Sequence, residues 1–244
     1  MPEQNRRWVV VYQLFYWPTI QGRGEFVRLA LEDAGVEYVD VARGPHGVRE
    51  LMAAMKSDDH PPFAPPFLKA GELTIGQTAN ILMYLGAHHS LAPRGEAGSL
   101  WTNQLQLTIA DLVAEVHETH HPIASSLYYE DQKLEALRRA ADFTATRIPK
   151  FFAYFERILT QPAPRSFVNG EHLSYADLSL FQVVEGLRYA FPRTTARLEP
   201  DHPALVALRE RVAARPRIAA YLASPRRIPF NQEGIFRHYP ELDG

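Results

Sequence analysis

The sequence of 244 residues contains no cysteine. Disulfide bonds, thiolate metal sites and redox exchange of the thioredoxin kind are therefore excluded. The sequence also lacks an apolar run long enough to span a bilayer. Any thiol chemistry must consequently use a thiol that the substrate brings.

An excess of charge of either sign is absent as well, since the formal net charge is −2. This balance gives no reason to expect nucleic acid or an anionic membrane as a partner. Residues 1–7 lack the apolar segment of a signal peptide, so we expect a cytoplasmic protein. A hydrophobic fraction of 46% suffices for one large or two small domains with ordinary cores.

The most informative stretch is residues 64–85, which predicts two short strands joined by a turn at Gly71 and then a helix. Apolar residues of that helix fall on one face, namely Ile81, Leu82 and Leu85. The pair Pro65-Pro66 precedes the first strand and favours a cis peptide bond. Gln77-Thr78 begins the helix, where free backbone N–H groups can bind a carboxylate.

This stretch resembles the segment Pro-x-Leu…Asp-Gly-x-Leu…Gln/Glu-Ser of the thioredoxin-like domain of glutathione S-transferases. The resemblance implies that the cis-proline loop holds the cysteinyl backbone of glutathione and that Gln77-Thr78 holds its γ-glutamyl carboxylate. The spacing to Gly71 favours Pro66 as the cis residue. Pro65 then offers a carbonyl but no N–H group; if Pro65 itself were cis, Ala64 would supply both.

The beginning of the chain predicts a β-α-β unit: a strand over Arg7–Phe15, a helix ending near Gly35 and a strand over Val36–Val41. The loop after the first strand resembles the Tyr-Phe-x-x-Arg-Gly-Arg-x-Glu start of tyrosine-type glutathione transferases of the alpha, mu, pi and sigma classes. The resemblance implies that Tyr16 is catalytic and that Trp17 and Arg23 bind glutathione. The loop is one residue longer here, so Tyr12 and Thr19 are alternatives to Tyr16.

A tyrosine suits this chemistry for a physical reason. A free thiol has a pKa of about 8.5, so little thiolate exists at neutral pH. A hydroxyl that donates to the thiolate stabilises the charged form by about 1.5–3 kcal/mol, or roughly one to two pKa units. Glutathione can then ionise without any help from an enzymic cysteine.

The resemblance implies further binding groups. Lys56 has the best spacing among the cations that could hold the glycyl carboxylate, the others being Arg43, His46 and Arg49. Tyr128 and Tyr129 lie where the family places an aromatic residue that faces the electrophile. An acid of the preceding helix would reach glutathione in a partner subunit, and Asp111, Glu115 and Glu118 are equal candidates.

Strand patterns stop after a linker at residues 89–98. Helices are predicted over Leu100–Leu127, with an interruption near Pro122, and over Lys133–Leu159. Ser174-Tyr175-Ala176-Asp177 matches a capping box that begins another helix. The sequence thus predicts an α/β thioredoxin-like domain (1–88), an all-α domain (99–225) and a tail (226–244) that folds over the site or a partner. Two shorter helices complete the all-α domain, over Val206–Ala214 and Arg217–Ala223.

A histidine-rich stretch follows in the first long helix, with His117 and His121 at the i, i+4 spacing of zinc-binding helices. No second ligand group is evident in the sequence, and a glutathione transferase needs no metal. We therefore expect this stretch to line the cleft between the domains or a dimer face, and we expect no metal.

Together these patterns predict a glutathione transferase that binds glutathione and a small hydrophobic electrophile, with no cofactor beyond glutathione as co-substrate. A homodimer is expected from the resemblance. Two alternatives use the same fold: a glutathione-binding or structural protein without turnover, and a glutathione-dependent isomerase or peroxidase.

Overall fold

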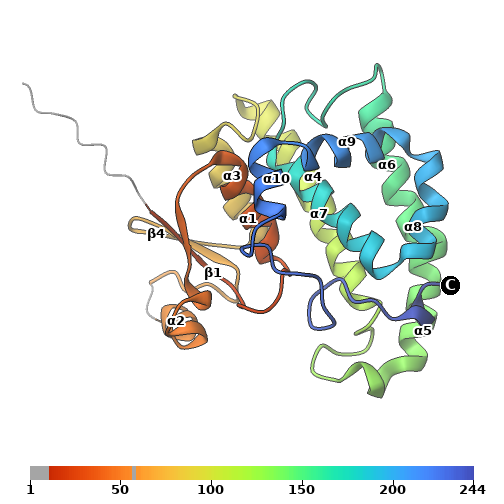
Figure 1. Cartoon of the computed structure of the whole chain (residues 1–244), viewed down its shortest axis with the longest axis horizontal. Coiled ribbons are helices and arrows are strands. Elements are labelled where there is room, and N and C mark those ends of the chain that lie inside the picture. Colours follow the sequence, from red (N-terminus) through yellow and green to blue (C-terminus); the bar gives the residue numbers. More distant parts are fainter. Residues whose placement is uncertain (1–10, 57–58) are drawn as a thin grey trace, which may run out of the picture.

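The computed structural model describes residues 11–56 and 59–244. The chain forms a small sheet flanked by helices and, beside it, an all-helical part (Figure 1). The expected strand at the start of the chain is confirmed as β1 (Tyr12–Phe15), whereas residues 7–10 of that prediction lie outside the described residues. The thioredoxin-like and all-α architecture predicted from the sequence is the architecture observed.

The sheet has four strands in the order β2-β1-β3-β4. Strand β1 pairs in parallel with β2 (Tyr38–Asp40) and antiparallel with β3 (Phe67–Ala70), which pairs antiparallel with β4 (Leu73–Gly76). Phe15 lies opposite Phe67, and Phe67 lies opposite Gly76. Because of this register, the end of β1, the start of β3 and the end of β4 lie side by side at one end of the strands.

Helices cover the two faces of the sheet differently. Helices α1 (Gly24–Ala34) and α3 (Thr78–His89) pack on the face that carries Leu14 and Leu68, which belong to the main core. Phe15 and Phe67 point to the other face and form a small second cluster with Leu51. Leu51 comes from α2 (Gly47–Ala54), a helix that the sequence analysis did not predict, although Val48, Leu51 and Met52 follow helical spacing.

The all-helical part begins with α4 (Glu96–Glu118) and is built around α7 (Tyr175–Ala190), most of whose residues are buried. The predicted capping box is present, since Asp177 accepts hydrogen bonds from the N–H and the hydroxyl of Ser174, both at 2.7 Å. Helix α4 ends at Glu118, which confirms the predicted interruption near Pro122, whereas the predicted continuation over residues 123–127 is not helical. The remaining helices are α5 (Lys133–Asp142), α6 (Ile148–Thr160), α8 (Pro192–Leu198), α9 (Pro203–Ala213) and α10 (Pro216–Leu222).

The predicted helix Lys133–Leu159 is continuous but contains a π-helical turn at Phe143–Arg147, which divides α5 from α6. Pro149 explains the turn, because proline lacks an N–H group and its ring crowds the carbonyl four residues earlier. The helix widens at that point and does not break. Within the described residues, no helix has both the length and the apolar character that crossing a membrane requires.

The tail after α10 runs across the junction of the two parts, as Figure 1 shows in blue. Arg226 pairs with Glu32 of α1 at 2.9 Å, and Arg227 pairs with the buried Glu25 of the same helix. Farther on, Asp243 accepts N–H hydrogen bonds from the first turn of α8. The tail therefore holds the sheet part and the helical part together.

Candidate active site

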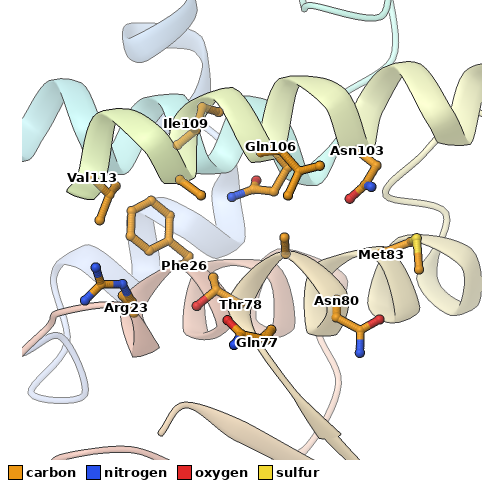
Figure 2. Close-up of a pocket in the computed structure, with 13 residues that line it drawn as sticks. Arg23, Phe26, Gln77, Thr78, Asn80, Met83, Asn103, Gln106, Ile109 and Val113 are labelled. Carbon is orange, nitrogen blue, oxygen red and sulfur yellow. The ribbon is translucent and has the colours of Figure 1, made fainter. Parts of the chain in front are cut away.

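A pocket of about 380 Å³ lies between α3 and α4, at the sheet edge where β4 ends (Figure 2). Helix α1 closes one end with Arg23 and Phe26, and Val113 of α4 faces them. Its polar lining comes from both parts of the chain, namely Arg23, Gln77, Thr78, Asn80, Asn103 and Gln106. The structure thus brings together three of the sequence-predicted glutathione-binding residues, Arg23, Gln77 and Thr78.

Gln77 and Thr78 are positioned by the tight passage from β4 into α3. Gln77 has a φ angle of 67°, a left-handed conformation that side chains other than glycine rarely adopt. This conformation places the N–H groups of the first turn of α3 at the pocket, where Thr78, Ala79 and Asn80 line the wall. The Thr78 hydroxyl is buried without a hydrogen-bond partner. Such a first turn favours an anionic group, and the hydroxyl adds a polar contact.

Gln106 of α4 is a pocket residue that the sequence analysis missed. Its side chain is 2% exposed, and its Oε1 atom is buried without a hydrogen-bond partner. A buried amide oxygen without a donor is uncommon, because leaving it unpaired costs about 1–3 kcal/mol. A signal was available in the sequence, since Gln106 shares a helix face with Leu105 and Ile109 and interrupts an apolar stripe.

Tyr16 follows β1 at the same sheet edge and is 5% exposed. Its hydroxyl oxygen accepts the Arg23 N–H at 2.8 Å, so the hydroxyl proton is left to donate elsewhere. Burial raises the pKa of this hydroxyl above its usual range, against the smaller effect of backbone N–H groups of Arg23 and Gly24 that lower it. Tyr16 is therefore a neutral donor at pH 7.

Two glycines allow the loop to wrap around Tyr16. A Cβ atom on Gly22 would lie 2.0 Å from the Tyr16 hydroxyl oxygen, and one on Gly24 would lie 2.5 Å from its ring. Gly22 also has a φ angle of 45°, which favours glycine. The loop thus fixes the ring while Arg23, between the two glycines, reaches the pocket.

The alternatives to Tyr16 are engaged elsewhere or point outward. The Tyr12 hydroxyl is hydrogen-bonded to Nε2 of His89 at 2.8 Å, inside the core between the sheet and α3. Thr19 is exposed, and its carbonyl accepts a hydrogen bond from Asn231 of the tail. Of the three hydroxyls, that of Tyr16 is the one held beside a pocket residue, Arg23.

The peptide bond between Pro65 and Pro66 is cis, which confirms the sequence prediction for Pro66. Both residues lie at the start of β3, beside the end of β1 that leads to Tyr16. Trp17 is half-buried and packs on the second cluster around Phe15 and Phe67. These three residues flank the site but do not line the pocket itself.

The predicted cations lie apart from the pocket. Lys56 is exposed beyond the end of α2. The Arg43 guanidinium donates to the carbonyl groups of Arg226 and Pro225, so it anchors the tail. Arg49 is hydrogen-bonded to His46.

The residues predicted to face an electrophile are also elsewhere. Tyr128 is 79% exposed, whereas Tyr129 is 3% exposed, stacks on Tyr239 and donates to Glu241 at 3.0 Å. Tyr129 therefore anchors the tail and has no hydroxyl to offer a ligand. Among the acids of α4, Glu115 pairs with Arg147 and Arg139, and Glu118 pairs with Arg139. Asp111 is exposed and has no such ion pair within residues 11–56 and 59–244.

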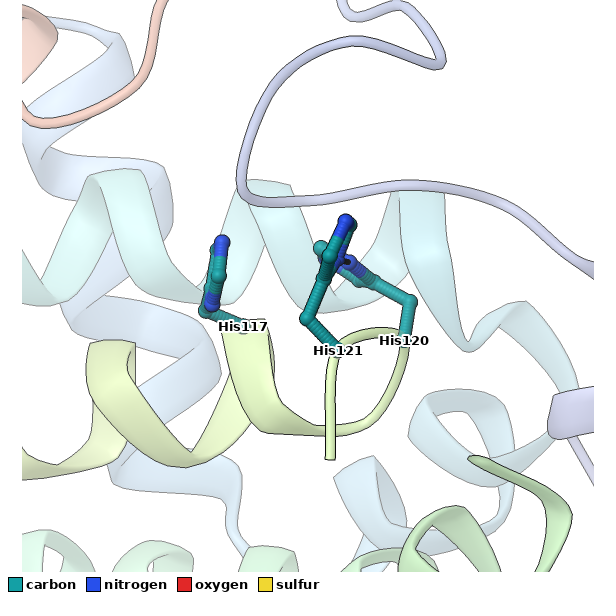
Figure 3. Close-up of side chains that lie close together, drawn as sticks. All are labelled: His117, His120 and His121. Atoms are coloured by element: carbon teal, nitrogen blue, oxygen red, sulfur yellow. Dashed lines mark hydrogen bonds between the residues drawn. The ribbon is translucent and has the colours of Figure 1, made fainter. Parts of the chain in front are cut away.

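Histidines occupy the end of α4, one helical turn beyond the pocket residue Val113 (Figure 3). Burial lowers the pKa of His117 to about 4 and that of His120 to about 3. The positive charge of Arg237 contributes to both shifts, and that of Arg23 contributes at His117. Both imidazoles are thus neutral at pH 7.

Comparison with known proteins agrees with this architecture. A sequence profile described as "Glutathione S-transferase, C-terminal domain" matches residues 117–225. Among curated proteins, a glutathione S-transferase of Plasmodium falciparum is 22% identical over 218 residues, covering 86% of this chain and 95% of that protein. "Glutathione S-transferase P 1" of Xenopus laevis is 27% identical, covering 88% and 93%.

Solved structures show the same fold at lower identity. The pi-class glutathione S-transferase of Onchocerca volvulus aligns with a TM-score of 0.67 at 20% identity, covering 86% of this chain and 91% of that one. The prostaglandin synthase D of Nilaparvata lugens aligns with a TM-score of 0.69 at 18% identity, covering 90% and 100%. The profile match over the helical part and the curated relatives over nearly the whole chain thus support a place in the glutathione S-transferase family, and the solved structures share the fold.

Proposed function

We propose that the protein is a glutathione transferase that binds glutathione in the pocket between α3 and α4 and ionises its thiol with Tyr16. The observation that carries the proposal is the pair of unsatisfied polar atoms in that pocket, Thr78 Oγ1 and Gln106 Oε1. Buried polar atoms without partners are expected where a ligand supplies the missing hydrogen bonds. The names of the relatives support glutathione as that ligand.

The γ-glutamyl end of glutathione carries a carboxylate and an ammonium group. The carboxylate fits the first turn of α3, where backbone N–H groups, the positive end of the helix and the Thr78 hydroxyl act together. The ammonium group fits the buried Oε1 of Gln106, which accepts but cannot donate. Each partial charge in the pocket thus faces a ligand group of opposite sign.

The cysteinyl part would lie along Pro65-Pro66, at the adjacent start of β3. Pro65 can offer its carbonyl to the cysteinyl N–H, whereas the reciprocal bond is absent because proline has no N–H group. This departure favours weaker glutathione binding than two backbone bonds would give. Arg23 would bring a positive charge close to the thiol end, because its charge acts on the Tyr16 hydroxyl and lowers the pKa of that group against the larger effect of burial.

Thiolate formation is the step assigned to Tyr16. The thiol proton leaves to solvent, and the Tyr16 hydroxyl donates a hydrogen bond to the sulfur anion, since its oxygen already accepts the Arg23 N–H. Because burial raises the pKa of Tyr16, the hydroxyl keeps its proton at neutral pH. The thiolate then attacks an electrophile: a carbon–sulfur bond forms while the leaving group departs with the electron pair, or a proton adds to an unsaturated acceptor.

An ultraviolet difference titration of glutathione into the purified protein at pH 7 tests the proposal. We expect a saturable thiolate band in the wild type that is lost in Tyr16→Phe, with activity reduced by about ten- to one-hundredfold. Tyr12→Phe is the matched control and should keep the band, because the Tyr12 hydroxyl bonds to His89.

The outcomes separate the alternatives. An unchanged band in Tyr16→Phe would contradict the assignment of Tyr16. Saturable binding without a thiolate band, and without turnover of any electrophile or peroxide, would instead support a glutathione-binding protein without catalysis. Absence of binding would overturn the pocket assignment itself.

A further inference from the structure

Three imidazoles converge where α4 ends. His117 is in the last turn of the helix, and His120 and His121 lie in the turn that follows. One ring nitrogen of each histidine lies within 4.8 Å of those of the other two. The rings of His117 and His121 are stacked at 4.9 Å and 18°, and Figure 3 shows both pointing toward the same side, where the tail passes.

The tail fixes the orientation of the central ring. Nε2 of His120 is 2.8 Å from the carbonyl oxygen of Ile235, and a carbonyl can only accept, so this nitrogen carries the proton. The lone pair of His120 is consequently on Nδ1, which accepts a hydrogen bond from Nδ1 of His121 at 2.5 Å; a metal ion would take the place of that proton. Metal-binding histidines in proteins are commonly held in this way, with one nitrogen donating to a backbone carbonyl and the other free to bind.

We propose that His117, His120 and His121 form a binding site for a divalent transition metal of the zinc, nickel or copper kind. Neutral imidazole is the ligand type that these metals share. Three protein ligands leave a fourth position open, as in solvent-accessible zinc sites. The sequence analysis expected no metal for lack of a second ligand group; in the structure the third ligand comes from the same stretch, because the turn after α4 brings His120 beside the i, i+4 pair and the tail holds its ring.

The cluster is close to the required geometry. Tetrahedral zinc–nitrogen bonds of about 2.0–2.1 Å place ligand nitrogens roughly 3.3 Å apart. One nitrogen from each residue lies at most 4.8 Å from the others, so the half-buried His117 and His121 would have to rotate to reach that spacing. The buried His120, held by Ile235, would stay in place.

The charges around the cluster determine the kind of site. Arg237 and Arg23 are the cations whose charge acts on these histidines. Glu115 and Glu118 of α4 are engaged by Arg139 and Arg147, so neither carboxylate joins the cluster. Two nearby cations weaken the binding of a dication and favour an anion, such as hydroxide or a carboxylate, in the open fourth position. We therefore expect micromolar affinity and little binding of Mg²⁺ or Ca²⁺, which prefer oxygen ligands.

The test uses the full chain without a histidine tag, stripped of metal by a chelator and kept free of glutathione, whose thiol binds metals. Titration with Co²⁺ followed by visible absorption, together with equilibrium dialysis against Zn²⁺, measures stoichiometry and geometry. We expect one ion per chain and the intense visible bands of tetrahedral Co²⁺. His117→Ala and His121→Ala should each weaken binding by roughly tenfold or more.

The matched control is His172→Ala, which removes an exposed imidazole in the loop before α7. It should bind the metal as the wild type does, and so should Tyr16→Phe, because the metal site does not depend on thiolate formation. His120→Ala is less informative, since its loss also frees the tail at Ile235. Absence of saturable binding by the wild type, or equal binding by His117→Ala and His121→Ala, would overturn the proposal.

Discussion

The pocket beside Gln77 and the histidine cluster lie one turn apart along α4, between Val113 and His117, yet the chain builds them differently. The pocket end depends on the sheet, whose register brings Tyr16 and Gln77 to one edge. The cluster depends on a tail residue, Ile235, that is 115 positions away from His120 in the sequence. Short motifs next to the strands thus supply part of the first site, to which α4 adds Gln106, whereas the second site is one local stretch of histidines whose central ring is held by the tail.

The largest expected effect concerns the buried charge network around Glu25, which connects α1 to the tail. Glu25 is fully buried and accepts hydrogen bonds from Arg28 and Tyr221 and from Arg227 of the tail. Glu25→Ala would leave the Arg28 guanidinium, also fully buried, with Asp40 as its one carboxylate partner. Breaking a buried charge network of this kind lowers the free energy of unfolding by about 3–5 kcal/mol.

Urea denaturation of Glu25→Ala measures that loss. Glu37→Ala removes an exposed carboxylate near the end of the same helix and should change the free energy of unfolding by less than about 0.5 kcal/mol. Similar losses in the two variants would show that this network does not hold the parts together.

Gly22→Ala tests the part of the candidate site that lies beside the sheet, because Gly22 packs against Tyr16. The new Cβ would lie 2.0 Å from the Tyr16 hydroxyl oxygen, so the ring must move. We expect a strained backbone that lowers the free energy of unfolding by about 1–3 kcal/mol and a loss of the glutathione thiolate band. Gly71→Ala is the control, because Gly71 has a φ angle of 62° but nothing within 4 Å of an added Cβ. It should lose stability while keeping the thiolate band; loss of the band in both variants would remove the special role of Gly22.

Thr78→Val sharpens the comparison at the pocket without touching the fold. The Thr78 hydroxyl has no hydrogen-bond partner among residues 11–56 and 59–244, so its removal should leave the free energy of unfolding unchanged or raise it slightly. Glutathione binding should weaken by about 1–1.5 kcal/mol, roughly five- to tenfold in Kd by calorimetry. Thr108→Val is the control. It should lower the free energy of unfolding and leave glutathione affinity unchanged, because the Thr108 hydroxyl donates to the Gln104 carbonyl and lies outside the pocket. If Thr78→Val and the wild type bound glutathione with equal affinity, the proposed carboxylate site at the first turn of α3 would be contradicted.

Tyr129→Phe has the smallest expected effect. It tests the contact between Tyr129 and the tail. It removes the hydrogen bond to Glu241 but keeps the stacking on Tyr239. We expect the free energy of unfolding to fall by about 0.5–1.5 kcal/mol, with glutathione affinity unchanged because Tyr129 does not line the pocket. A clear loss of glutathione affinity would instead return Tyr129 to the ligand site, as the sequence analysis first expected.

The sheet domain, the helical domain and several local features could be predicted from the sequence alone. Pro66, the Gln77-Thr78 helix start and the Ser174–Asp177 capping box were predicted correctly because each depends on contacts within a few residues. Strand register then follows from the alternation of buried side chains. Helix α2 was missed although Val48, Leu51 and Met52 follow helical spacing, and the structure shows that Leu51 is its buried residue.

Which polar side chains share a site could not be predicted from the sequence, because it depends on the packing of distant segments. Gln106 became a pocket residue and Tyr129 a tail anchor through packing between helices that are distant in sequence. His120 likewise gained its orientation from Ile235. Hydrogen bonds between distant segments leave no periodic trace in either segment, so spacing along the chain cannot predict them. Short motifs therefore predict local features, whereas the grouping of Gln106, Tyr129 and His120 with their neighbours depends on packing between distant segments.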